Sequence, residues 1–142
     1  MFEYCDGNDQ IKLKKLYYNG CLEITDLYNV ANNIKHNLCD NDLKYFKKLK
    51  KLDASCSNEK ITDDGIRNMN LHTLDASFNS KITDDGIKNM NLHTLNARKN
   101  SKITDEGIKN MNLRTLNARG NSKITDEGIK NMNLHTLYAR YN

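Results

Sequence analysis

The sequence has few hydrophobic residues for its length and no long apolar run. Hydrophobic residues make up 37% of its 142 residues, and the mean hydropathy is −0.81. No run approaches the roughly 18 consecutive apolar residues that a membrane-spanning helix needs. The first six residues contain neither the basic region nor the apolar region of a signal peptide. We therefore expect a single domain that is located inside the cell and does not enter a membrane.

The sequence also lacks the motifs of metal sites and of most catalytic sites. Cys5, Cys21, Cys39 and Cys56 form no C-x-x-C pair, which argues against a zinc site. Without a secretion signal, we expect four reduced thiols in a cytosol-like compartment. No Ser–His–Asp or Cys–His arrangement and no glycine-rich phosphate loop is present. The sequence therefore predicts neither a metal nor another cofactor, and it predicts a protein that is not an enzyme.

What the sequence does contain is a repeated unit of 21 residues. Copies begin at Lys60, Lys81, Lys102 and Lys123, and the last copy stops at Asn142. The apolar positions of the unit are the same in each copy, and the differences fall almost entirely on polar positions. A fixed period near 20 residues is typical of a solenoid, in which each unit buries its apolar face by stacking on its neighbours.

Each unit predicts a short strand followed by a short helix. Residues 113–119 alternate around Leu116 and Ala118, a period of two residues that indicates a strand. Thr104 is a suitable N-cap for a helix, and two acidic residues follow it in the first turn. Gly107 stands where a capping box would have glutamate, so we expect a helix of only one or two turns.

The first 48 residues follow this pattern loosely. Asn19-Gly20 separates two β-compatible runs, which is a strong signal for a β-hairpin. We expect residues 1–23 to form a cap, largely this hairpin, that covers the first edge of the sheet. The solenoid then spans residues 24–142, with degenerate units at 24–48 and 49–70, regular units from residue 71, and a last unit cut off at residue 142.

The repeated pattern Leu-x-x-Leu-x-Ala-x-x-Asn-x-x-Ile resembles the leucine-rich-repeat motif. The segment Ile-Thr-Asp-Glu-Gly-Ile that follows is similar to the helical half of the cysteine-containing repeats found in F-box proteins. The resemblance implies an α/β solenoid that bends into an arc, with a concave parallel sheet and short convex helices. Asparagine replaces the cysteine of that class, and no F-box precedes the repeats, so a ubiquitin-ligase role is not implied.

Equivalent positions of successive units form columns with neighbours about 4.8 Å apart. Four apolar columns are expected in the core: Leu74, Leu95, Leu116 and Leu137; Ala76, Ala97, Ala118 and Ala139; Ile82, Ile103 and Ile124; and Met69, Met90, Met111 and Met132. The column of Asn79, Asn100 and Asn121 resembles the asparagine ladder of the family, whose amides bind loop backbone between units.

Three further columns face outward, and they change from acidic and small residues to basic and aromatic ones. They are Asp53, Asp75, Asn96, Asn117 and Tyr138; Ser55, Ser77, Arg98, Arg119 and Arg140; and Lys50, His72, His93, Arg114 and His135. We expect a protein partner to bind the concave face. The predicted contact residues are His93, Asn96, Arg98, Arg114, Asn117, Arg119, His135, Tyr138 and Arg140.

The stacked arginines leave two interpretations open. Three like charges at strand spacing repel one another, so they favour an anionic partner, unless loop acids such as Asp105 and simple hydration offset the repulsion. Nucleic acid is one such partner, and Tyr138 and Tyr141 are suited to stacking on bases. The net charge of +4 and the isoelectric point of 8.8 are low for a dedicated nucleic-acid binder, so nucleic acid is the less favoured partner.

The last strand suggests a second way to associate. No helix follows it in the sequence, and an uncovered strand exposes unpaired N–H and C=O groups. We expect this end to bind a second copy as a homodimer, which makes a structural or assembly role the alternative to a protein-binding role. The residues predicted for this contact are Leu137, Tyr138, Arg140, Tyr141 and Asn142.

Overall fold

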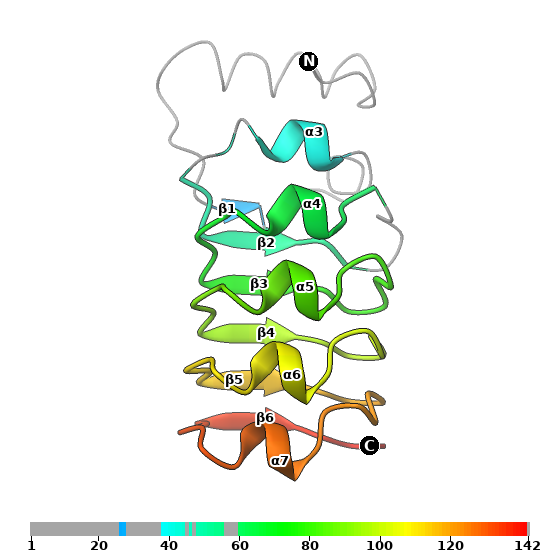
Figure 1. The fold of residues 1–142 in the computed structure, drawn as a ribbon, viewed down its shortest axis with the longest axis vertical. Helices are drawn as coiled ribbons and strands as arrows, with labels where there is room; N and C mark the ends of the chain where they lie inside the picture. The colour runs from blue at the N-terminus through cyan, green and yellow to red at the C-terminus, as the bar shows by residue number, and fades with distance from the viewer. Residues whose placement is uncertain (1–25, 28–37, 45, 47, 56–59, 142) are drawn as a thin grey trace.

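The fold is a stack of units, each made of one strand and one helix. The computed structural model describes residues 26–27, 38–44, 46, 48–55 and 60–141. In these residues six parallel strands form one sheet in chain order, and a four-residue helix lies between each pair of consecutive strands from β1 to β6 (Figure 1). The strands are β1 (Asp26–Leu27), β2 (Lys51–Asp53), β3 (Thr73–Asp75), β4 (Thr94–Asn96), β5 (Thr115–Asn117) and β6 (Thr136–Tyr138). The helices are α3 (Asp40–Leu43), α4 (Asp63–Ile66), α5 (Asp84–Ile87), α6 (Asp105–Ile108) and α7 (Asp126–Ile129).

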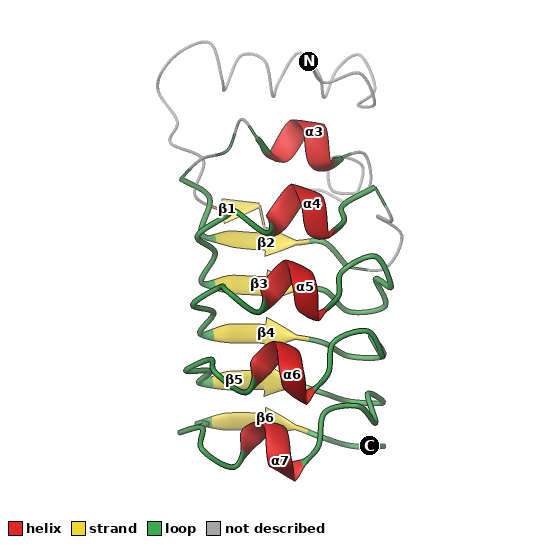
Figure 2. Cartoon of the chain, viewed as in Figure 1, coloured by secondary structure: helices red, strands yellow, loops and turns green. Residues whose placement is uncertain are grey.

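The sheet forms one layer and the helices form the other (Figure 2). Strand pairing keeps the 21-residue period, since Leu74 pairs with Leu95, and Leu95 pairs with Leu116. The predicted α/β repeat with a parallel sheet and short helices is therefore confirmed. The predicted cap at residues 1–23 lies outside the described residues, and the unit boundaries and the curvature of the arc remain predictions. None of the helices described is both long and apolar enough to span a membrane.

The core is a ribbon of apolar side chains between the two layers. The leucine, alanine and isoleucine columns are almost completely buried as far as Ile124. Met90 and Met111 are buried with them, while Met69 and Met132 are half-buried against the edge of the core. The predicted core columns are thus confirmed, except that Leu137 and Ala139 of the last unit are exposed.

An asparagine ladder joins neighbouring units inside the stack. The Asn100 side-chain amide donates to the carbonyls of Ala76 at 3.1 Å, Asn79 at 2.7 Å and Ile82 at 3.0 Å. The Asn100 side-chain oxygen accepts from the backbone N–H of Lys102 at 3.0 Å. Asn79 and Asn121 occupy the same position in their own units and are also buried. The ladder satisfies backbone groups that no strand reaches, as the resemblance implied.

A second ladder joins the helices, and the sequence reasoning missed it. The Asp84 carboxylate accepts from the backbone N–H of Thr104 at 2.7 Å and from its hydroxyl at 2.7 Å. The Thr104 hydroxyl in turn accepts from the backbone N–H of Glu106, which confirms Thr104 as the N-cap of α6. A Cβ atom on Gly107 would lie 2.2 Å from an Asp84 oxygen, so the glycine makes room for this carboxylate. Equivalent pairs are Asp40–Thr62, Asp63–Thr83 and Asp105–Thr125.

Candidate interaction surface

The outer face of the sheet is the surface that the helices do not cover. In β4, Thr94 and Asn96 are half-exposed on either side of the buried Leu95, so their side chains point away from the core. Thr73, Thr115 and Thr136 are the equivalents of Thr94 in β3, β5 and β6. This threonine column lies where the strands begin, and the sequence reasoning did not single it out. In each strand the residue directly before the leucine must face outward by the same two-residue period. Applying this rule to the sequence would have found the threonine column.

The asparagines predicted to contact a partner also shape the turn after each strand. The Asp75 carboxylate accepts from the backbone N–H of Ser77 at 2.9 Å and from the side-chain amide of Asn96 at 2.8 Å. The Asn96 side-chain oxygen accepts from the backbone N–H of Arg98 at 3.2 Å, and Asn117 makes the same bond in the next unit. These Asx turns fix the direction in which the chain leaves the strand. Asn96 and Asn117 therefore have a structural role in addition to any contact with a partner.

A column of left-handed residues follows these turns. Phe78, Lys99, Gly120 and Tyr141 have φ values of 58°, 51°, 65° and 67°. The backbone N–H groups of the first three donate to the carbonyls of Arg98, Arg119 and Arg140 in the next unit, at 2.9, 3.0 and 3.1 Å. A residue other than glycine costs about 1 kcal/mol in this conformation. Three of the four positions nevertheless carry large side chains, and these lie beside the arginines.

We call the surface formed by Arg98, Arg119, Arg140, Phe78, Lys99 and Tyr141 the basic rim. The Arg98 guanidinium and the Lys99 ammonium lie 5.3 and 5.4 Å from the centre of the Phe78 ring. The Arg140 guanidinium lies 5.0 Å from the centre of the Tyr141 ring. Cations at these distances are attracted to the faces of aromatic rings. The rings are accessible, since Phe78 is 42% and Tyr141 is 75% exposed.

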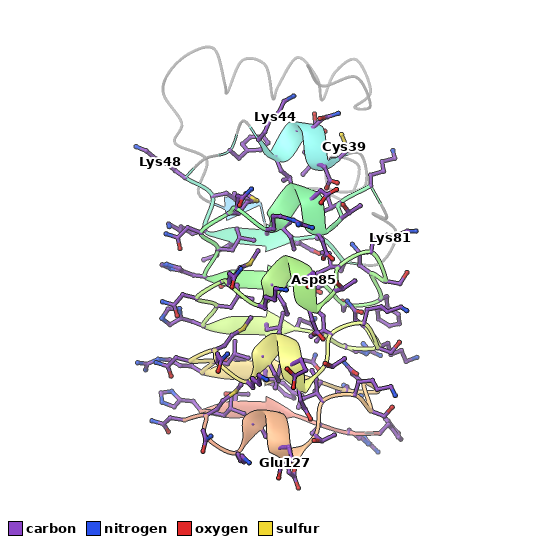
Figure 3. The ribbon with its side chains drawn as sticks, viewed as in Figure 1. Cys39, Lys44, Lys48, Lys81, Asp85 and Glu127 are labelled. Carbon is purple, nitrogen blue, oxygen red and sulfur yellow. The ribbon has the colours of Figure 1, made fainter. Side chains whose placement is uncertain are left out.

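The rim arginines have no carboxylate partner in the part of the chain that the structure describes. The suggestion that Asp105 neutralises them is wrong, because both oxygens of its carboxylate accept hydrogen bonds from Thr125 on the helix side. Basic residues on the helices are neutralised instead: Asp85, labelled in Figure 3, pairs with Lys88 at 2.6 Å. Equivalent pairs are Asp64–Arg67, Glu106–Lys109 and Glu127–Lys130. No ion pair therefore neutralises the rim arginines among the described residues.

A pocket of about 290 Å³ lies within the rim. It is lined by Arg98, Lys99, Arg119, Gly120 and Tyr141, and most of its surface is apolar. Gly120 leaves the space between Lys99 and Tyr141 unfilled, because it is the one member of its column without a side chain. The rim thus combines an apolar hollow with guanidinium and ammonium groups around it.

Three matches to the leucine-rich-repeat family model cover residues 67–90, 88–110 and 109–132, in consecutive units of the stack. The protein is a leucine-rich-repeat protein. Repeats of this family are generally non-catalytic and typically form modules that bind other proteins. A comparison with curated proteins found no match.

In this leucine-rich-repeat protein the predicted contact residues divide between two edges of the sheet. His93, Arg114 and His135 directly precede β4, β5 and β6, whereas the arginines of the rim follow these strands. His93 and Arg98 are therefore separated along the strand by up to about 16 Å, and the set of contact residues stays a prediction. The His72 and His93 rings lie near each other, with centres 5.2 Å apart, and Nδ1 of His93 is buried without a hydrogen-bond partner among the described residues.

The last described unit of the leucine-rich-repeat protein exposes residues that are buried elsewhere in the stack. Leu137 is 42% exposed, whereas Leu116 at the same position in the preceding unit is 0% exposed. A hollow of about 390 Å³ lies beside Leu137, lined in part by Ile124, Ile129 and Asp126. Of the other residues predicted for self-association, Tyr138, Arg140 and Tyr141 are exposed, and Asn142 lies outside the described residues.

Proposed function

We propose that this leucine-rich-repeat protein binds another protein through the outer face of its sheet and the adjoining basic rim, and that it catalyses no reaction. The rim arginines form no ion pair among the described residues, and this observation carries the proposal. A charged surface without internal partners favours binding to a complementary surface, because such contacts speed association and select the partner.

A comparison of the constant and the variable positions of the repeat supports the same proposal. Many residues that are the same in each unit fill the core or build the two ladders, as Asn100, Asp84 and Gly107 do. The clearest difference between units is at the position of the buried Ser77, which becomes the half-exposed Arg98 and Arg119 and the exposed Arg140 in successive units. The strand pairing and the buried leucines of the stack are kept while this position changes.

A capture experiment tests the proposal. The tagged protein would be compared with a variant carrying Arg98→Ala, Arg119→Ala and Arg140→Ala, using lysate of the source cells. Lys88→Ala, Lys109→Ala and Lys130→Ala form the matched control, since they remove the same number of charges from the helices. We expect the wild type and the control to retain a discrete protein that the rim variant loses. Capture of the same proteins by all three would contradict the proposal, provided that circular dichroism shows equal folding.

A second function, self-association through the last unit, is favoured by the exposure of Leu137 and the hollow beside it. Burying an exposed leucine at an interface between copies stabilises the assembly by roughly 1–2 kcal/mol per side chain. Light scattering coupled to size exclusion measures the mass directly. We expect twice the chain mass of 16.4 kDa for the wild type and the monomer mass for Leu137→Asp. A wild-type mass equal to one chain would exclude this function.

A further inference from the structure

We propose that the basic rim binds an acidic peptide segment of the partner protein. In this arrangement an apolar side chain of the segment fills the pocket between Lys99 and Tyr141, and flanking carboxylates pair with the arginines. The inference rests on the proposed protein-binding function, and it names the site and the chemistry of what it binds.

The stacking of the arginine guanidinium groups on aromatic rings supports carboxylates as the ligands. Arg98 lies over the Phe78 ring and Arg140 lies over the Tyr141 ring. Stacking uses the face of a guanidinium group and leaves its N–H edges free to donate to both oxygens of a carboxylate. The ring also limits the motion of the arginine before binding, which lowers the entropy lost when the pair forms.

The pocket accounts for the apolar part of the ligand. Its volume of about 290 Å³ is at the lower end of the range for ligand sites, and suits a single side chain of a peptide. The surface around it is largely apolar, so burying an aliphatic or aromatic side chain there is favourable. Lys99 and Tyr141, which line the pocket, have a left-handed backbone. Glycine would adopt this conformation with less strain, yet both positions carry a large side chain.

The distribution of charge favours a peptide over a nucleic acid. Among the described residues, cations outside the rim also form no ion pair, namely Lys81, Lys102, Arg114 and Lys123. The rim differs from them because its cations lie beside aromatic rings and around an apolar pocket. A nucleic-acid strand needs a longer basic track to follow its phosphates. The isoelectric point of 8.8 is also below the range typical of such binders. A short acidic segment needs only the few cations that the rim supplies.

Fluorescence anisotropy with defined probes tests the inference. The probes are labelled peptides Glu-Glu-Leu-Glu-Glu, Gln-Gln-Leu-Gln-Gln and Glu-Glu-Gly-Glu-Glu, and a single-stranded oligothymidylate. We expect the first peptide to bind most tightly and to weaken as salt is raised. Replacing the rim arginines together, as Arg98→Gln, Arg119→Gln and Arg140→Gln, should weaken its binding about tenfold. The matched helix variant, Lys88→Gln, Lys109→Gln and Lys130→Gln, should bind it like the wild type.

Four outcomes would overturn the inference. They are no binding of the first peptide, equal losses in the rim and helix variants, equal binding of the leucine and glycine peptides, and tighter binding of the oligothymidylate. The capture experiment shows whether only the acidic-peptide site is wrong or whether the proposed protein-binding function is wrong. If the rim variant loses its protein partner although the acidic peptide does not bind, the proposed function stands and the acidic-peptide site is wrong. If the peptide binds at the rim but no captured protein depends on the arginines, the protein-binding function is wrong.

Discussion

The Asp84 carboxylate holds Thr104 of the next unit by two hydrogen bonds, each 2.7 Å long. One comes from the backbone N–H and the other from the hydroxyl, so a single aspartate fixes both the position and the side chain of the helix cap. The same carboxylate lies against Gly107, where a Cβ atom would be 2.2 Å from its oxygen. Asp84, Thr104 and Gly107 thus form one contact that joins two neighbouring units, and we call it the joint.

Replacing the glycine of this joint should destabilise the protein. We expect Gly107→Ala to lower the free energy of unfolding by about 2 kcal/mol, because the new methyl group displaces the Asp84 carboxylate from Thr104. Urea unfolding followed by circular dichroism measures the change, with Ser101→Ala at an exposed position as the control. In the double variant with Asp84→Ala the two losses should not add, since they break the same joint. Full additivity would contradict the proposed clash.

Replacing an asparagine of the buried ladder should have a larger effect. Asn100→Ala leaves the carbonyls of Ala76, Asn79 and Ile82 without the donor that they share. We expect a loss of about 3 kcal/mol in the free energy of unfolding, because three buried hydrogen bonds are lost together, although the carbonyls of Ala76 and Asn79 keep a backbone N–H donor. Asn110→Ala in the same unit removes an exposed asparagine, and its unfolding midpoint should match that of the wild type. Equal effects of the two changes would rule out a special role for the ladder.

The first described helix offers a stabilising change. Cys39 stands at the N-cap of α3, where the later units have threonine. Burial is the main cause that raises the pKa of the Cys39 thiol above its ordinary value of 9.0, so the group is neutral near pH 7 and is a weak hydrogen-bond acceptor. We expect Cys39→Thr to raise the free energy of unfolding by about 1 kcal/mol. Cys39→Val, which has a similar shape but no acceptor, should give no such gain in the same urea experiment.

The ion pairs on the helices predict one measurable pH dependence. The side-chain hydrogen bond from Lys88 lowers the pKa of Asp85 below its ordinary value of 3.8. A lowered pKa means that the pair stabilises the folded state above pH 3.8, and that this contribution is lost as the pH falls through the folded value. NMR titration of the Asp85 carboxyl should give a value below 3.8 in the wild type. In Lys88→Met the value should rise, and an unchanged value would show that the pair does not form in solution.

Periodicity predicted the stack because the repeated residues act the same way in each unit. The spacing of Leu95 and Ala97 predicted the strand and the core, and Thr104 predicted the start of the helix. The pairing of Asp84 with Gly107 was missed, because the two residues lie in different units and only stacking brings them together. Gly107 was interpreted as a missing capping box, whereas its role is to leave space for a neighbouring carboxylate.

The candidate site was predicted only in part, for a similar reason. The alternation in each strand predicted that Arg98 and Arg119 face outward, and both are half-exposed. His93 was also predicted to face outward, but it has the same parity as the buried Leu95 and Ala97, and it lies half-buried in the bend before β4. The contribution of Phe78 and Lys99 was missed because it depends on left-handed turns, and residues other than glycine do not indicate such a backbone in a sequence.

Chemical-shift mapping by NMR tests the central claim most directly, because it locates the bound partner on the surface. The labelled protein would be titrated with the Glu-Glu-Leu-Glu-Glu peptide and with the captured partner. We predict the largest shifts at the amides of Arg98, Lys99, Arg119, Gly120 and Tyr141, with little change in α4 to α7. Shifts concentrated in the helices, or confined to the hollow beside Leu137, would contradict the assignment of binding to the basic rim.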